Sequence, residues 1–234
     1  MIFLGTDTIK AFEKQTSSAS VAASLSRAIH EHRLSPGTKL GEDELAEIYQ
    51  VSRTIIRTSL QSLAYGQLVE IHRNRGAFVA HPTPQEAHEV FETRELLEPR
   101  TAWTAAQKAS KEDIAFLLSH IEKEHAALAK NDRGLALYLS GQLHVHIARI
   151  AAQATITGFI ETLIARSSLI VALYWKRESA LCESHAHHAL ILALEKNDET
   201  AAEGLMRSHL VDIHSALELH NPSTVGASLK EILG

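Results

Sequence analysis

Two arginines that lie four residues apart are the first candidates for chemistry in this sequence. Arg53 and Arg57 belong to the run VSRTIIRTSLQSL, residues 51–63. Drawn as a helix capped by Ser52, the run places both arginines on a polar face, opposite a face of isoleucine and leucine. A guanidinium group can hydrogen-bond two acceptors of a guanine edge or clamp a phosphate. The arginine face is therefore either a solvated helix surface or a surface that reads DNA.

Histidine is the second candidate source of chemistry, and it is distributed unevenly. The chain has 15 histidines, and 12 of them lie at or after residue 81. Imidazole is a common ligand of zinc, nickel and related ions. This uneven distribution of histidine indicates that the C-terminal part has a chemical role that differs from that of the N-terminal part.

The charge of the chain is divided in the same way. The net charge is -5, but residues 1–80 hold 9 Lys and Arg against 8 Asp and Glu, whereas residues 81–234 hold 14 against 20. Residues 51–80 contain four arginines and a single acidic residue, Glu70. An acidic protein therefore keeps a local basic surface that could meet nucleic acid.

Composition also bounds the location of the protein. No apolar run approaches the roughly 20 residues needed to span a bilayer, and the N-terminus lacks the pattern of a signal peptide. The single cysteine excludes an internal disulfide and any multi-cysteine metal site, as in a reducing compartment. We expect a cytoplasmic protein.

The first 80 residues follow the pattern of three helices and a hairpin. Apolar residues recur at helical spacing near residues 18–32 and in residues 42–50, and the arginine run supplies the third helix. The β-prone runs LVEI and AFVA flank RNRG, residues 73–76, which predicts a hairpin with a basic tip. This is the order of a winged helix-turn-helix, whose third helix enters the major groove.

That order favours one of the two interpretations of the arginine face. Most arginines on helix surfaces are simply solvated, but here the preceding helix, the tight turn and the basic wing all agree with DNA binding. The third helix would meet base edges, and the wing would reach the adjoining backbone or minor groove. We therefore expect DNA contacts from Ser52, Arg53, Thr54, Arg57, Arg73, Arg75 and Gly76.

Helical periodicity dominates from Gln85 to the end of the chain. About six amphipathic segments follow one another, which predicts an antiparallel all-α bundle and a mainly α chain. The expected organisation is an N-terminal tail at 1–17, a winged helix-turn-helix at 18–80, a linker at 81–84, a helical bundle at 85–220 and a C-terminal segment at 221–234.

Two sets of motifs resemble the GntR family of bacterial transcription regulators. The stretch LSPGTKLGEDELAEIYQVSRTIIRTSLQSLAYGQLVEIHRNRGAFV follows the pattern of the family's winged helix almost end to end. Residues 85–220 resemble the FCD ligand-binding domain of the FadR-type branch, through TRELLEPRTAWTAA, LHVHIARIAAQATI, HHALILALEKND and LMRSHL. The resemblance implies a DNA-binding regulator whose helical domain binds an effector.

Some positions depart from the family pattern. Ile55 and Thr58 stand where proline and glutamate are common, and Asp43 stands where some relatives have an arginine that contacts DNA. Because Arg53 and Arg57 are kept, these departures affect the operator sequence more than DNA binding itself.

The resemblance also implies a divalent metal inside the bundle, zinc or nickel by ligand type. Members commonly hold the ion with an aspartate and three histidines. The histidines match His144, His187 and His209, and the aspartate position is Ser140. His146 is two positions from His144 and points elsewhere on a helix, so the two cannot share one cavity. Without the family match, scattered histidines are more often surface or core residues.

A three-histidine ion keeps open positions that can accept the carboxylate of a small organic acid. Arg94, in TRELLEPR, matches a position that could hold the effector. The alternative for Arg94 is a structural salt bridge to a bundle glutamate.

Together, these features predict a homodimeric repressor that binds palindromic operator DNA and responds to a small carboxylate. One alternative is the same regulator with a metal-free effector pocket, and another is a bundle that serves only for dimerisation. A metal-dependent hydrolase would also need a positioned base, which no HExxH or comparable motif supplies. We therefore predict that the protein is not an enzyme.

Overall fold

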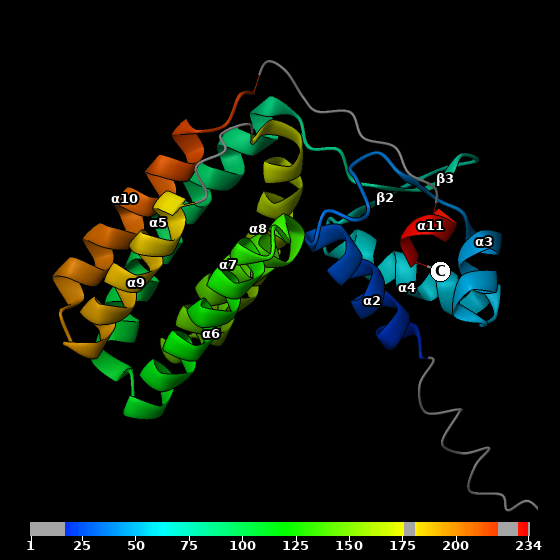
Figure 1. Cartoon of the computed structure of the whole chain (residues 1–234). Coiled ribbons are helices and arrows are strands. Elements are labelled where there is room, and N and C mark those ends of the chain that lie inside the picture. Colours follow the sequence, from blue (N-terminus) through cyan, green and yellow to red (C-terminus); the bar gives the residue numbers. More distant parts are fainter. Residues whose placement is uncertain (1–16, 176–180, 220–228, 234) are drawn as a thin grey trace, which may run out of the picture. The chain divides into compact units, whose positions relative to one another are not determined.

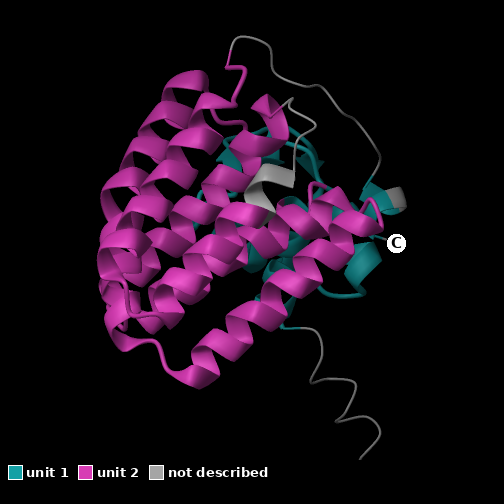
Figure 2. Cartoon of the chain, turned by 60° about the vertical axis from the view of Figure 1, so that its left-hand side comes forward, with its two compact units in different colours: residues 1–29, 33–80, 225–234 teal, residues 30–32, 81–224 magenta. Residues whose placement is uncertain are grey.

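The computed structural model of this 234-residue chain describes residues 17–175, 181–219 and 229–233. The chain divides into two compact units (Figure 2): an N-terminal unit of residues 1–29, 33–80 and 225–234, and a helical unit of residues 30–32 and 81–224. Of the expected N-terminal tail only Ser17 is described, and of the expected C-terminal segment only residues 229–233 are described.

The N-terminal unit contains the three expected helices and the expected hairpin (Figure 1). Its apolar core includes Leu25, Ile29 and Leu45. The sheet is antiparallel with the order β1-β3-β2, so a short strand that the sequence analysis did not predict pairs with the hairpin. The elements are α2 (Ser18–His30), β1 (Lys39–Leu40), α3 (Glu42–Tyr49), α4 (Arg53–Tyr65), β2 (Val69–His72) and β3 (Gly76–Val79).

Residues in the left-handed region form the sharp turns of this unit. Gln50 has φ 53° and ends α3, and its backbone N–H bonds to carbonyls in the last turn of that helix. At the hairpin tip, Asn74 has φ 63° and Gly76 has φ 93°. Asparagine and glycine tolerate these angles best, which fixes the position of the turn.

The short helix α11 (Leu229–Leu233) belongs to the N-terminal unit and packs against α3. Leu229 is buried, and the Arg33 guanidinium donates to the backbone carbonyl of Ile232 at 3.2 Å. The sequence pattern predicted only a C-terminal segment here, without a helix or a packing partner. Residues 229–233 therefore add to the N-terminal unit, although they follow the bundle in sequence.

The helical unit contains the six predicted helices, with bounds that shift by a few residues. They are α5 (Pro84–Lys108), α6 (Lys111–Ala129), α7 (Arg133–Ile150), α8 (Ala154–Tyr174), α9 (Leu181–Glu195) and α10 (Glu199–Ser215). Side-chain caps explain the starts of four of these helices. Thr83 and Ser110 form capping boxes with Glu86 and Asp113, and aspartates cap α7 and α10.

Packing in the bundle brings α7 close to α8. A Cβ added to Gly141 would lie 2.9 Å from Cγ2 of Ile164, so only glycine allows this approach. By length and composition alone α8 could cross a membrane, which the sequence analysis did not anticipate. The helix packs against α5 and α7 and buries Ile160 and Ile170, as the core helix of a bundle does.

Candidate DNA-binding surface and histidine centre

The two faces of α4 are those that the sequence predicts. Ile56 and Leu60 are buried, whereas the side chains of Arg53 and Arg57 are 60% and 59% exposed. Ser52 precedes the helix, and its hydroxyl accepts the backbone N–H of Ile55 at 3.4 Å. The cap fixes where the helix begins and so presents both arginines from its first two turns.

Both arginines are paired with acids of α3. Arg57 forms two parallel hydrogen bonds with the Glu42 carboxylate, at 3.1 and 2.7 Å, and Arg53 lies 2.9 Å from Asp43. The hydrogen bond from Arg57 is the main cause that lowers the pKa of Glu42 below its usual value. These pairs cannot be inferred from the charges of residues 51–80 alone, because Glu42 and Asp43 of α3 precede that range.

The wing residues lie at the tip of the β2–β3 hairpin. Arg73, Arg75 and Gly76 are all exposed, and the Arg75 guanidinium is 5.9 Å from the centre of the Phe78 ring. Strand pairing between His72 and Gly76 closes the turn. The hairpin therefore presents two cations from a short, defined loop.

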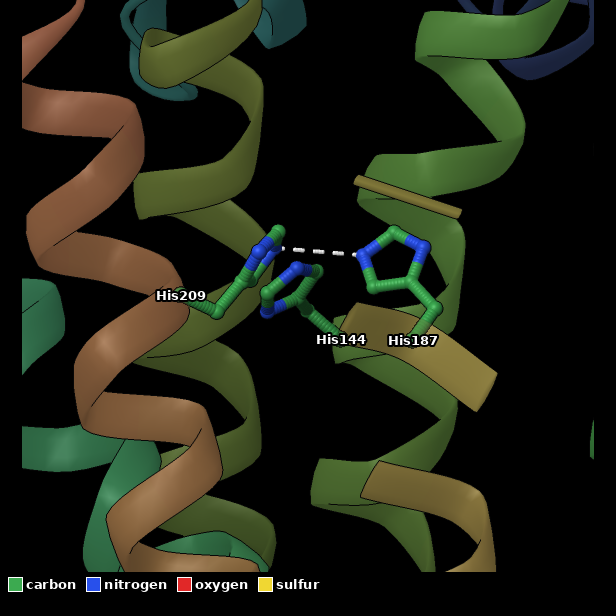
Figure 3. A group of neighbouring side chains, drawn as sticks. All are labelled: His144, His187 and His209. Atoms are coloured by element: carbon green, nitrogen blue, oxygen red, sulfur yellow. Dashed lines mark hydrogen bonds between the residues drawn. The ribbon is translucent and has the colours of Figure 1, made fainter. Parts of the chain in front are cut away.

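The second candidate site is a group of three buried histidines in the helical unit. His144, His187 and His209 come from α7, α9 and α10, and their rings point toward one another (Figure 3). One nitrogen of each ring lies within 4.8 Å of one nitrogen of the other two, and Nε2 of His187 is 3.2 Å from Nε2 of His209. Neighbouring histidines point elsewhere: His188 is exposed and His146 contacts Phe116.

Two buried glutamates orient the rings. Glu98 accepts from Nδ1 of His144 at 2.5 Å, and Glu124 accepts from Nδ1 of His187 at 3.2 Å. Because an ionised carboxylate can only accept, Nδ1 of both rings must carry the proton, which leaves Nε2 of a neutral ring as an acceptor. In His187 this Nε2 accepts a hydrogen bond from Nε2 of His209. Carboxylates orient metal-binding histidines in the same way. Neither glutamate was predicted from the sequence. Only Glu98 has a local signal, because it lies four residues after Arg94 on the same helix.

Arg94 is buried in the same cluster. Its Nε donates to Glu98 at 2.6 Å, and its Nη2 lies 3.5 Å from Nδ1 of His144. The salt bridge considered as the alternative role of Arg94 is therefore present. Burial alone would raise the pKa of Glu98, but Arg94 and His144 outweigh it and lower the pKa to about 2.

Burial acts on the histidines in the opposite sense. It lowers the pKa of His144 despite the contact with Glu98, and it lowers the pKa of His209 well below the usual value, helped by His187 and His144. Neutral imidazole is the form that binds a metal ion. The lowered pKa values of His144 and His209 therefore favour the form of these two rings that can bind a metal ion.

A small cavity adjoins the cluster. Its wall includes Arg94, Ser140, His144 and Ser167, and its volume is about 50 Å³. Ser140 lies one turn before His144 on α7 and is buried. A guanidinium group, an imidazole ring and two hydroxyl groups thus line one cavity.

Family models match most of the chain in two blocks. Residues 17–79 match the bacterial regulatory proteins of the gntR family, and residues 89–212 match the FCD domain. The chain belongs to the gntR family of regulators with an FCD domain. Its relatives are transcription regulators and not enzymes, so this GntR regulator binds DNA rather than catalysing a reaction.

The relatives of this GntR regulator cover most of its length. The Uxu operon transcriptional regulator of Escherichia coli is 28% identical over 78% of this chain and 79% of the relative. The galactonate operon transcriptional repressor of the same species is 29% identical over 78% of this chain and 89% of the relative. The solved structure of Escherichia coli McbR/YncC, 19% identical, has a TM-score of 0.75 and covers 85% of this chain and 95% of its own. That last likeness shows the fold.

Proposed function

We propose that this regulator is a cytoplasmic homodimeric repressor that releases a palindromic operator when a small carboxylate binds in the helical unit. The DNA contacts come from Ser52, Arg53, Thr54, Arg57, Arg73, Arg75 and Gly76. Repression is supported by the relative that is a galactonate operon repressor, and a dimer matches the two-fold symmetry of helix-turn-helix operators. The observation that carries the effector site is the buried group of three histidines beside Arg94.

The residues of the histidine centre fit a divalent zinc or nickel ion. His144, His187 and His209 would bind it through nitrogen, and Glu98 and Glu124 already fix two of the rings by their Nδ1 atoms. Three histidines with an open position form a common zinc site, and such an ion supplies a Lewis-acidic position for a carboxylate oxygen. Ser140 offers a neutral hydroxyl at the position where the family resemblance implies an aspartate, so the protein would bring one negative charge less to the ion.

The formal charges of the cluster favour an anionic effector. Arg94 contributes one positive charge, whereas Glu98 and Glu124 contribute two negative charges as carboxylates. A divalent ion would bring the sum to one positive charge in a buried space. Uncompensated buried charge is costly, so a carboxylate that enters the cavity would restore neutrality.

Control of DNA binding requires that the effector prefer one arrangement of the dimer. A ligand with equal affinity for the DNA-bound and free arrangements would shift nothing. The effector would therefore bind the DNA-free form more tightly, and by reciprocity operator DNA would weaken effector binding by the same factor.

Elemental analysis of the purified protein tests the metal site first. The protein is prepared without a histidine tag and without chelators, beside His187→Ala and the matched control His188→Ala, whose side chain is exposed on the same helix. We expect near-stoichiometric zinc or nickel in the wild type and the control, and its loss in His187→Ala. If no protein takes up added zinc or nickel, the metal-free effector pocket replaces the metal site.

A further inference from the structure

Most of the histidines that gather after residue 81 lie outside the histidine centre. Two of these others, His88 on α5 and His214 on α10, lie close together where the two helices pack side by side (Figure 1). Nδ1 of His88 is 3.0 Å from Nε2 of His214, and the rings meet edge to face with their centres 5.1 Å apart. A second pair of imidazole nitrogens therefore faces each other in the helical unit.

The ring of His214 is held in place by two other residues of α5. Glu95 lies 3.3 Å from Nδ1 of His214 and, as a carboxylate, accepts a hydrogen bond from it. The ring also stacks on the buried Phe91, with 5.2 Å between the ring centres and 18° between the planes. Spacings of three and four residues place His88, Phe91 and Glu95 on one face of α5. A neutral His214 therefore keeps the lone pair of Nε2, and this atom faces His88.

The distance between the two nitrogens suits a shared metal ion. Zinc binds imidazole nitrogen at about 2.0–2.1 Å, so two such ligands lie about 2.9 Å apart at a right angle and about 3.4 Å apart at a tetrahedral angle. The 3.0 Å between His88 and His214 falls within this range. Without an ion, His88 donates the hydrogen bond to Nε2 of a neutral His214. An ion would take the place of that proton and make both nitrogens its ligands.

A hydrogen-bonded pair of histidines can also serve packing alone, but this pair is open to solvent. His88 is exposed, and the side chain of His214 is 21% exposed. Both residues line a groove of about 750 Å³, together with Glu95 and Ser215. An ion can therefore enter from solvent and complete its coordination with water. Imidazole ligands suit zinc, nickel or copper better than magnesium or calcium, which prefer oxygen ligands.

We propose that His88 and His214 bind a second divalent transition-metal ion at the surface of the helical unit, and that Glu95 is the positioning residue that orients His214. The proposal does not depend on the effector site, because it shares no ligand with the histidine centre. An ion at this site would join α5 to α10. Since these helices also carry Arg94 and His209, it would stabilise two helices that contribute to the histidine centre.

Zinc binding by the full chain tests the surface site. Resident metal is removed with a chelator, the protein is equilibrated with a defined concentration of free zinc, and the bound zinc per chain is measured by elemental analysis. We expect the wild type to bind one zinc ion more per chain than His88→Ala. The matched control is His125→Ala, an exposed histidine of α6 outside the groove, which should bind as much zinc as the wild type.

Glu95→Ala tests the orienting role of the carboxylate. We expect the zinc affinity of the surface site to fall about tenfold, because loss of the carboxylate behind a metal-binding histidine typically has an effect of that size or more. The amount of zinc bound at saturation should stay that of the wild type. An unchanged affinity would remove Glu95 from the proposal.

Unfolding in urea gives a second measurement of the surface site. Zinc should raise the midpoint more in the wild type than in His88→Ala, because the ion joins the two helices only in the folded chain. Equal zinc content and equal stabilisation in these two proteins would overturn the surface site and leave the histidine centre untouched. Equal loss of zinc in His88→Ala and His125→Ala would also overturn it, since zinc would then bind scattered surface histidines. If the histidine centre holds no metal, the zinc content falls in every protein, but the difference between the wild type and His88→Ala remains.

Discussion

Replacing Glu98 with glutamine should strongly destabilise the helical unit. The side chains of Glu98 and Arg94 are 2% and 4% exposed and lie 2.6 Å apart. Glutamine keeps the shape and can still accept a hydrogen bond, but it removes the charge that compensates the guanidinium. Breaking a buried ion pair from one side costs about 3–5 kcal/mol, because the remaining charge is left without a partner. We expect a loss of that size in the free energy of unfolding.

The matched control is Glu95→Gln on the same helix. Glu95 also accepts from a histidine, Nδ1 of His214 at 3.3 Å, but both side chains are partly exposed. Water replaces much of such an interaction, so its loss should cost about 1 kcal/mol or less. The two variants therefore make the same chemical change in a buried and in a hydrated setting.

Tryptophan fluorescence in urea is a suitable assay, because both tryptophans of the chain, Trp103 and Trp175, lie in the helical unit. A chelator keeps bound metal from adding to the stability of the native state. If both variants lost the same small amount of unfolding free energy, Glu98 would not be the group that compensates the buried charge of Arg94. Adding Arg94→Met to Glu98→Gln should recover most of the loss, since the unpaired charge is then gone.

Four further predictions concern other parts of the chain. Arg57→Ala should weaken operator binding by about 1–3 kcal/mol if Arg57 reads a base. If Arg57 contacts a phosphate, the variant should instead lower the slope of log affinity against log salt concentration by about 1. Fluorescence anisotropy at several salt concentrations distinguishes the two, and an unchanged affinity and slope would exclude both roles. Glu42→Gln should tighten binding by about 1 kcal/mol or less in the same assay, because the carboxylate no longer competes with DNA for Arg57, and weaker binding would mean that it positions the arginine instead. Gly141→Ala should lower the free energy of unfolding by about 1–3 kcal/mol, because the added methyl group overpacks the contact with α8. Gly158→Ala has open space around it and should be neutral or stabilising in urea unfolding. Equal effects of the two variants would contradict the close approach of α7 and α8. The hydrogen bond from the backbone N–H of Thr83 lowers the pKa of Glu86 in the folded protein below 4.5. The Glu86 carboxylate therefore stabilises the fold above pH 4.5, and this contribution is lost as the pH falls through the lowered pKa. Glu86→Gln should flatten this part of the profile of unfolding free energy against pH.

Local patterns in the sequence were sufficient for most of the secondary structure. The period of apolar residues predicted both faces of α4 and the six helices of the bundle, because amphipathic spacing is a property of each segment by itself. Turn residues placed the hairpin for the same reason. The strand β1 was missed, since two residues are too few to carry a period and their pairing depends on β3.

The candidate sites depended on tertiary structure to a larger extent. His144, His187 and His209 could be chosen only by resemblance, because the rotation and packing of three separate helices decide whether their rings meet. The orienting carboxylate of Glu124 comes from a fourth helix and has no local signal. Likewise, Glu42 pairs with Arg57 only once α3 packs against α4. The sequence by itself determined which side chains each helix offers on each face, and the packing of the helices decided which of them meet.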